Sequence, residues 1–190
     1  MYIIKKSLLL MFMLVLTACT VASLNFNKLD YPVTSKPVMG KLVLIIPSAA
    51  AQRQFTVPAS AAKAANDQVI LAGQLLVAVA DYEYPKIFTG YDRVPSTAAI
   101  LPGFYRAMMR LTVTSFIVEH HVVHVTLHAD MYSYQGKLLY EKSFDGQAQV
   151  DTTLQAATLS AYRDAIQQVN DRLEQLLYWE DHADTDHGNH

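Results

Sequence analysis

The sequence predicts an α+β protein, a two-layer sandwich in which an antiparallel sheet of about four strands carries two helices on one face. Three patterns predict this class: a two-residue hydrophobic period between residues 106 and 149, helical periods over residues 60–84 and 152–177, and a short apolar run at 41–46. Each helix and the sheet has one apolar face. Packing the helices on the sheet buries all three faces together.

The strands follow from these patterns. Residues 41–46 are apolar without alternation and are stopped by Pro47, which predicts a strand in the middle of a sheet or covered on both faces. Apolar residues alternate with polar ones over 123–132, which predicts a half-buried antiparallel strand. A tight turn at 134–137 then leads to a third strand, so that 106–149 forms a three-stranded meander.

The helices are predicted from steps of three and four residues. Ser60 is a candidate N-cap for the first helix, and Pro85 is expected to end it. Gly73 lies inside this helix, which suggests close approach to a neighbouring backbone. Thr152 begins the second helix, with Gln155 placed as in a capping box. The apolar stripes are Val69, Ala72, Leu76, Val79 and Ala80 in the first helix, and Leu159, Tyr162, Ile166, Val169, Leu173 and Leu176 in the second.

The chain divides into four regions. Lys5 and Lys6 precede an apolar run at 8–16, which is about half the length of a membrane-spanning helix, so residues 1–18 are expected to be a signal peptide. Residues 19–39 are polar and irregular, as in a flexible tether. Residues 40–179 form a single α+β domain, and the tail rich in His and Asp, 180–190, is expected to be disordered.

The signal ends in Leu16-Thr17-Ala18-Cys19, which resembles the lipobox of bacterial lipoproteins. This resemblance implies cleavage before Cys19 and a diacylglycerol on its sulfur, which anchors the chain to a membrane. Cys19 is also the only cysteine, so no intrachain disulfide can form. Because Thr20, and not aspartate, follows the cysteine, the usual lipoprotein sorting rule implies the periplasmic face of the outer membrane. No cofactor is expected besides the covalent lipid.

With its tether and its order of elements, the chain resembles the small outer-membrane auxiliary lipoproteins, including the LptE-like, YajG-like and PqiC-like groups. The residues that carry the resemblance are Leu16 to Cys19, the strand at 42–46, the hairpin at Gln135-Gly136 and the helix at 152–177. The resemblance implies non-catalytic work, as a binding or auxiliary subunit of a cell-envelope assembly or transport complex, with an envelope protein as partner. It transfers no functional residue.

Several function classes lack their sequence signals. A formal net charge of −2 gives nothing that attracts nucleic acid. No G-x-S-x-G turn, second cysteine or phosphate-binding glycine loop is present, so we expect no catalytic residues and no enzyme. His124 and His128 would share a strand face about 13 Å apart, too far to bind one ion, so no metal site is expected.

The stretch 86–104 has no periodicity, and a structureless segment of this length is often functional. Aromatic side chains surround it, which is typical of protein interfaces. The candidate partner-binding residues are Tyr84, Phe88, Tyr91, Phe104 and Tyr105. The alternative is a satellite core that pins the segment to the domain. For the whole protein, two further alternatives are a periplasmic carrier of a lipid or other apolar ligand and a metal-handling lipoprotein.

Overall fold

The computed structural model describes residues 38–62, 66–100, 105–151 and 153–186 of the 190-residue chain, although the side chains at both ends of this range are not described. All of these residues belong to one compact unit, Ser35–His190. The predicted signal peptide, Cys19, most of the tether, Phe104 and Thr152 lie outside the described residues.

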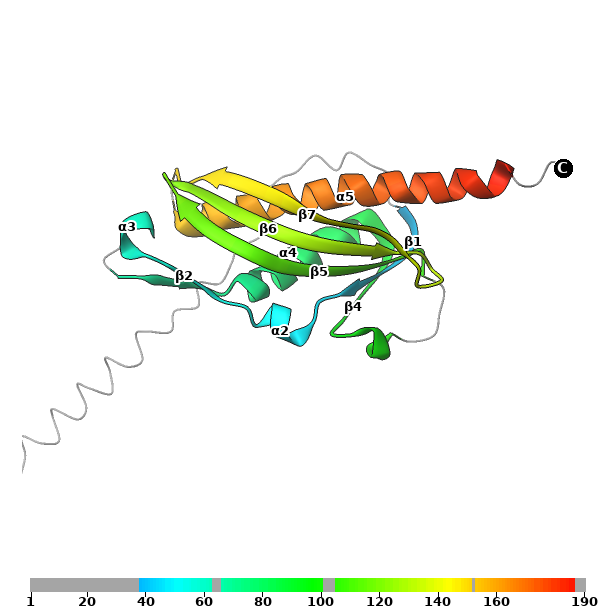
Figure 1. Ribbon diagram of the computed structural model, residues 1–190, viewed down its shortest axis with the longest axis horizontal. Coiled ribbons are helices and arrows are strands. Elements are labelled where there is room, and N and C mark those ends of the chain that lie inside the picture. Colours follow the sequence, from blue (N-terminus) through cyan, green and yellow to red (C-terminus); the bar gives the residue numbers. More distant parts are fainter. Residues whose placement is uncertain (1–37, 63–65, 101–104, 152, 187–190) are drawn as a thin grey trace, which may run out of the picture. The chain divides into compact units, whose positions relative to one another are not determined.

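A five-stranded mixed sheet forms one layer of the molecule (Figure 1). Its strands follow one another in space in the order β4 (Phe88–Val94), β1 (Val38–Ile45), β5 (Ala107–Glu119), β6 (Val122–Tyr132) and β7 (Leu138–Gln149). β1 is parallel to both of its neighbours, whereas β5, β6 and β7 form the antiparallel meander that the alternation predicts. The α+β class is therefore confirmed, but the sheet has one strand more than expected and is not purely antiparallel.

The additional strand is β4, which lies within the segment 86–104 that we expected to be irregular. Leu42 of β1 lies opposite Tyr91 of β4 on one side and opposite Ala107 of β5 on the other. β1 is thus a central strand, and the apolar run 42–46, which ends one residue beyond it, is buried throughout, as the unbroken run predicts.

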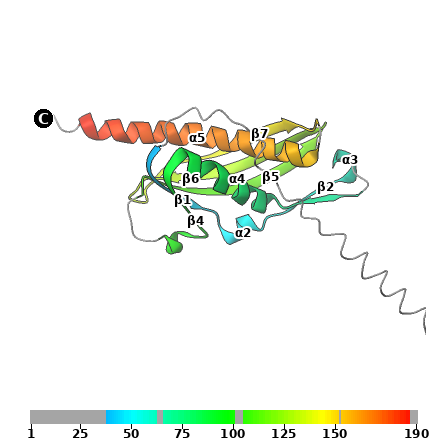
Figure 2. The same cartoon turned by 180° about the vertical axis from the view of Figure 1, so that it is seen from behind.

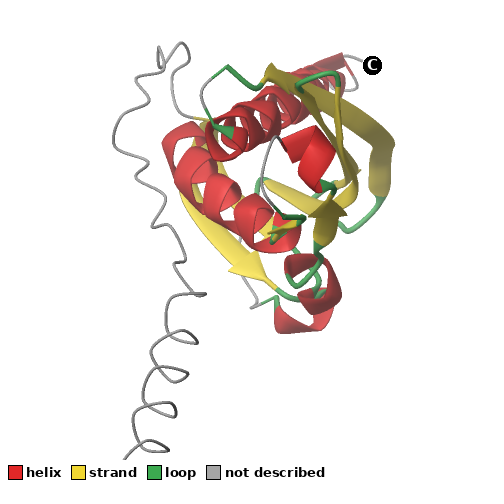
Figure 3. Ribbon diagram, turned by 90° about the vertical axis from the view of Figure 1, so that its left-hand side faces the viewer, coloured by secondary structure: helices red, strands yellow, loops and turns green. Residues whose placement is uncertain are grey.

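Two long helices, α4 (Ala72–Ile87) and α5 (Leu154–Asp186), cover one face of the sheet. They lie behind the sheet in Figure 1 and in front of it in Figure 2. Figure 3 shows the curved sheet beside the helices in an end-on view. The short helix α2 (Ser48–Ala51) was not predicted, whereas α3 (Ala59–Ala62) lies where the sequence predicts the start of the first helix.

The first long helix begins later than its apolar pattern predicts. β2 (Phe55–Val57) pairs with β3 (Gln68–Ile70), and this hairpin takes up residues that we assigned to the helix. Val69 therefore lies in a strand, where it is 59% exposed, and does not belong to the helix stripe. At the other end, Pro85 lies within the last turn of α4 and does not stop it, because the helix continues to Ile87.

Gly73 makes the close backbone approach that its position suggests. A Cβ atom on this residue would lie 2.0 Å from the carbonyl oxygen of Ala50 in α2. The Gly73 N–H also donates a 2.9 Å hydrogen bond to the carbonyl oxygen of Arg53. Only glycine allows α4 to begin this close to α2.

The second long helix begins at Leu154, and its cap is one residue later than predicted, because Thr153 Oγ1 accepts a 3.1 Å hydrogen bond from the Ala156 N–H. It continues to Asp186, so most of the tail that we expected to be disordered from residue 180 is helical. In Figure 1 its C-terminal turns run past the ends of the strands.

The hydrophobic core lies between the two helices and the sheet. The predicted helix stripes are buried from Leu76 to Ala80 and from Leu159 to Leu173. Tyr162 of α5 also donates a 2.8 Å hydrogen bond to the carbonyl oxygen of Ala72, which joins the two helices. Side chains with no more than 1% exposure in this core include Leu42, Leu44, Leu76, Val79, Leu111, Leu127, Tyr162 and Ile166.

Candidate functional site

The five predicted partner-binding residues have different environments. Tyr84 and Phe88 are 0% and 3% exposed, so these two side chains are part of the core and cannot contact a partner. Tyr91 and Tyr105 are partly exposed, and Phe104 lies outside the described residues. The structure therefore keeps Tyr91 and Tyr105 as candidates and supports the alternative of a packed core for Tyr84 and Phe88.

Tyr91 and Tyr105 line the same surface hollow. Small-ligand sites in proteins have volumes of about 300 to 1,000 Å³. The hollow itself has a volume of about 470 Å³ and lies at the C-terminal end of the edge strand β4. Its walls come from β1, α4, β4 and the 3₁₀ turn η2 (Thr97–Ala99). The lining residues are Val43, Asp81, Tyr91, Asp92, Arg93, Val94, Ala99, Ile100 and Tyr105.

One wall is a hydrogen-bonded group between α4 and β4. Tyr91 and Arg93 are two residues apart on β4, so their side chains leave the strand on the same face, where Asp81 of α4 meets both. The Tyr91 hydroxyl donates a 2.8 Å hydrogen bond to Asp81 Oδ1. Arg93 Nε lies 2.9 Å from Asp81 Oδ1 and 3.2 Å from Oδ2.

The surroundings of Tyr91 and Arg93 shift the pKa values of both side chains. Burial raises the pKa of Tyr91, and its hydrogen bond to Asp81 raises the pKa further. The hydrogen bond to Asp81 also raises the pKa of Arg93. At neutral pH Tyr91 is therefore a neutral phenol and Arg93 is a cation.

Asp92 of β4 also lines the hollow, and it forms a second ion pair, with Lys41 of β1. The Lys41 ammonium also lies 5.8 Å from the centre of the Tyr105 ring, within the range of a cation–π contact. Lys41 pairs with Asp92 and Arg93 pairs with Asp81, so the formal charges of the two pairs cancel. The hollow therefore offers apolar surface and hydrogen-bonding groups without a strong field of either sign, which suits a polypeptide better than a charged small molecule.

The edge of β4 adjoins this hollow. β4 pairs with β1 on one side, and no other described strand pairs with its second side. An edge strand presents backbone N–H and C=O groups that can pair with an additional strand.

Sequence reasoning identified the two tyrosines of the hollow but missed Lys41, Asp81, Asp92 and Arg93. The two-residue spacing of Tyr91 and Arg93 is compatible with a strand, but the pattern is short and follows Gly90, so it gives only a weak signal. Asp81 is one of several polar residues within the first predicted helix. Its meeting with Arg93 depends on the packing of α4 beside β4, which the sequence does not specify.

The comparisons with known proteins give no family assignment. No family model matches the chain, and no curated protein matches it. Among solved structures, a Xanthomonas campestris protein of the DUF330 family is similar over 79% of this chain and 92% of its own, with 14% identity and a TM-score of 0.47. The lipoprotein GNA1162 of Neisseria meningitidis is similar over 70% of this chain and 99% of its own, with 13% identity and a TM-score of 0.33.

Proposed function

We propose that this chain is a lipoprotein on the periplasmic face of the outer membrane, where it acts as a non-catalytic binding subunit of a cell-envelope assembly or transport complex. The observation that carries the binding role is the hollow lined by Tyr91 and Tyr105 beside the open edge of β4. The lipobox at Leu16 to Cys19 supports the anchor.

The anchor rests on physical chemistry as well as on the motif. Each methylene group of an acyl chain contributes about 0.8 kcal/mol in a bilayer, so two or more chains hold a protein firmly on the membrane. Among the described residues, every helix is too short or too polar to span a bilayer.

The partner segment that fits best is an extended peptide lying along β4. Its backbone would pair with the free side of the strand, and its side chains would enter the hollow against Tyr91 and Tyr105. Tyrosine suits this role because it buries a large apolar area and keeps a hydroxyl for hydrogen bonding.

A lipid carrier receives less support from the fold. Such a carrier needs space between its layers, and here that space is filled by fully buried side chains of β1, α4 and α5. The hollow beside β4 opens at the surface, so it would leave much of a long acyl chain in water.

The lipid anchor predicts that Cys19→Ala abolishes acylation and leaves an unprocessed precursor. Cells fed an alkyne-labelled fatty acid should incorporate the label into the wild-type chain alone, and the variant should migrate as the longer precursor. Thr20→Ala serves as the control and should be labelled and processed as wild type. Equal labelling of Cys19→Ala would refute the anchor.

The binding role predicts that a partner lies beside Ala99, an exposed alanine that lines the hollow. A photo-crosslinking amino acid at position 99 should yield a discrete adduct in intact cells. The same amino acid at Ala156, an exposed alanine on α5, should yield none. Adding Tyr105→Ser to the position 99 protein should reduce the adduct at least about fivefold, because truncating an interface tyrosine commonly costs more than about 1 kcal/mol. Equal adducts at both positions, or an adduct that Tyr105→Ser leaves unchanged, would contradict the proposal.

A further inference from the structure

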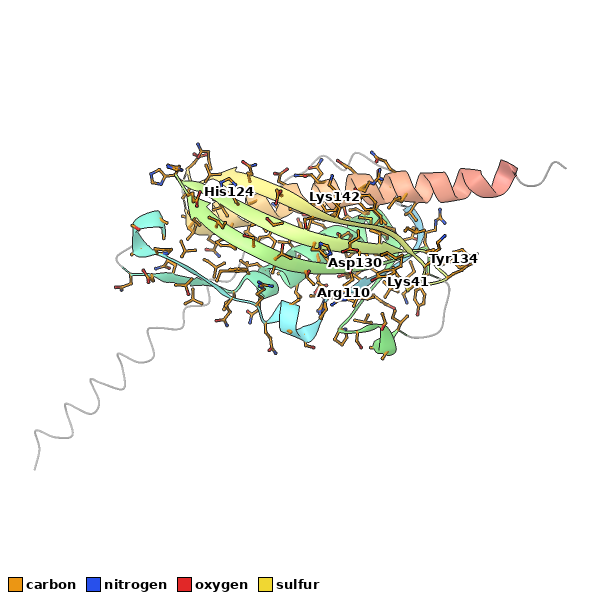
Figure 4. The ribbon with its side chains drawn as sticks, viewed as in Figure 1. Lys41, Arg110, His124, Asp130, Tyr134 and Lys142 are labelled. Atoms are coloured by element: carbon orange, nitrogen blue, oxygen red, sulfur yellow. The ribbon has the colours of Figure 1, made fainter. Side chains whose placement is uncertain are left out.

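A second polar group lies on the face of the sheet opposite the helices. His128 and Asp130 are two residues apart on β6, so both side chains leave the same face, and Glu141 of β7 is the cross-strand neighbour of Asp130. Figure 4 shows Asp130 and Arg110 close together on this face, with His124 near the far end of the sheet.

The three side chains converge on one point. His128 Nε2 lies 3.1 Å from Asp130 Oδ1 and 3.3 Å from Glu141 Oε1. One potential ligand atom from each residue can be chosen so that all three lie within 4.8 Å of one another. A ring nitrogen carries at most one proton, so it can donate well to only one of the two carboxylates that face it. A cation at this point would contact all three groups.

Both distances from His128 Nε2 fit a tetrahedral metal centre. Two ligand atoms that each lie about 2.0 Å from a tetrahedral Zn²⁺ are about 3.3 Å apart, which is close to both measured distances. The other ring nitrogen of His128, Nδ1, lies 3.2 Å from Ser143 Oγ. A hydrogen bond at this nitrogen orients the ring and leaves Nε2 as the ligand atom, as is usual for metal-binding histidines.

The surroundings leave room for a further ligand. The group lines a surface hollow of about 320 Å³, together with Arg110, Thr112, Tyr132 and Leu138. Two carboxylates and the Arg110 guanidinium give a formal charge of −1 when His128 is neutral, so a dication is not repelled by the site as a whole. Side-chain exposures of 29% for His128 and 15% for Asp130 keep these two ligands partly shielded from water, whereas Glu141, at 57%, remains accessible.

We propose that His128, Asp130 and Glu141 bind a divalent transition-metal ion of the zinc class, with the fourth position open to water or to a ligand atom from a partner. Histidine nitrogen and carboxylate oxygen are both zinc ligands, and zinc sites with three protein ligands leave the fourth position open. The imidazole favours a transition metal over magnesium or calcium. The site differs from the pair of histidines weighed in the sequence, because His124 takes no part in it.

The test is zinc binding to the full-length lipidated protein in detergent micelles. All samples carry His182→Gln, His187→Gln and His190→Gln, so that the C-terminal histidines do not contribute, and all are first stripped with a chelator. Calorimetric titration with Zn²⁺ alone should show one ion per chain. His128→Gln and Glu141→Gln should each weaken that binding at least about tenfold, because even the loss of an outer contact of a metal site commonly weakens binding tenfold or more. His124→Gln, a matched change on the same face of β6, should bind as the parent protein does.

Folding is checked on the same samples. Glu141 is mostly exposed, so Glu141→Gln should leave the thermal unfolding of the metal-free protein unchanged. Zinc should raise the Tm of the parent protein and of His124→Gln, and it should raise that of Glu141→Gln by less. Absence of zinc binding in the folded parent, or equal binding by the parent and Glu141→Gln, would overturn the proposal.

Discussion

Ile166→Asp is expected to unfold the domain or to prevent its accumulation. Ile166 is 1% exposed on the face of α5 that packs against the sheet, so the new carboxylate would be buried without a partner. Burying an unpaired polar or charged group costs several kcal/mol, which is a large part of the roughly 5 to 15 kcal/mol that stabilises a typical domain. The measurement is chemical denaturation of the chain lacking its first 19 residues.

Asp171→Ala is the matched control on the exposed side of the same helix. A surface change of this kind shifts the free energy of unfolding by no more than about 0.5 kcal/mol. Similar denaturation midpoints for the two variants would mean that the packing face of α5 is assigned wrongly.

Gly146→Ala is expected to lower the free energy of unfolding by about 3 kcal/mol, the upper part of the usual range for overpacking. A Cβ on Gly146 would lie 2.0 Å from the carbonyl oxygen of Ala161 and 2.6 Å from the backbone nitrogen of Ala165. Both are backbone atoms of α5, which cannot rotate away as a side chain can. The helix would have to move off β7 and open the core beneath it.

Gly90→Ala is the control for this effect, because Gly90 is also a strand glycine. The nearest atom to its added Cβ is Lys41 Cγ at 3.2 Å, which belongs to a flexible and partly exposed side chain. Thermal and urea unfolding should show a shift below about 1 kcal/mol for Gly90→Ala. Equal losses in the two variants would show that the close contact of α5 with Gly146 does not control stability.

Elements with a clear hydrophobic period were predictable from the sequence. The alternation along β6 and the helical stripe through Tyr162, Ile166 and Val169 correctly identified which side chains are buried. These patterns arise because one face of each element meets the core along its whole length. The unbroken apolar run of β1 correctly indicated a central strand.

Elements determined by contacts between distant segments were not predictable. β4 contains Gly90 and the charged pair Asp92 and Arg93, so it shows no clear alternation, and only its pairing with β1 makes it a strand. β3 was hidden in a sequence rich in helix-forming residues, because its pairing with β2 overrides local propensity.

The hollow beside β4 and the group around His128 also differ in how far the sequence predicts them. Tyr91 and Tyr105 could be identified because aromatic residues beside a nonperiodic segment are a sequence signal. The grouping of His128 and Asp130 with Glu141 depends on the register between β6 and β7. A shift of that register by one residue would turn Glu141 to the other face of the sheet.

The central position of β1 also determines the order in which the fold can be completed. Synthesis delivers β1 before β4 and β5, yet these two are the only described strands with which β1 pairs. By contrast, β5, β6 and β7 follow one another in the chain, so hairpin closure brings them together rapidly. The apolar strand β1 therefore has at least one unpaired side until β5 has been synthesised, and such an open, apolar edge can pair with other chains and aggregate.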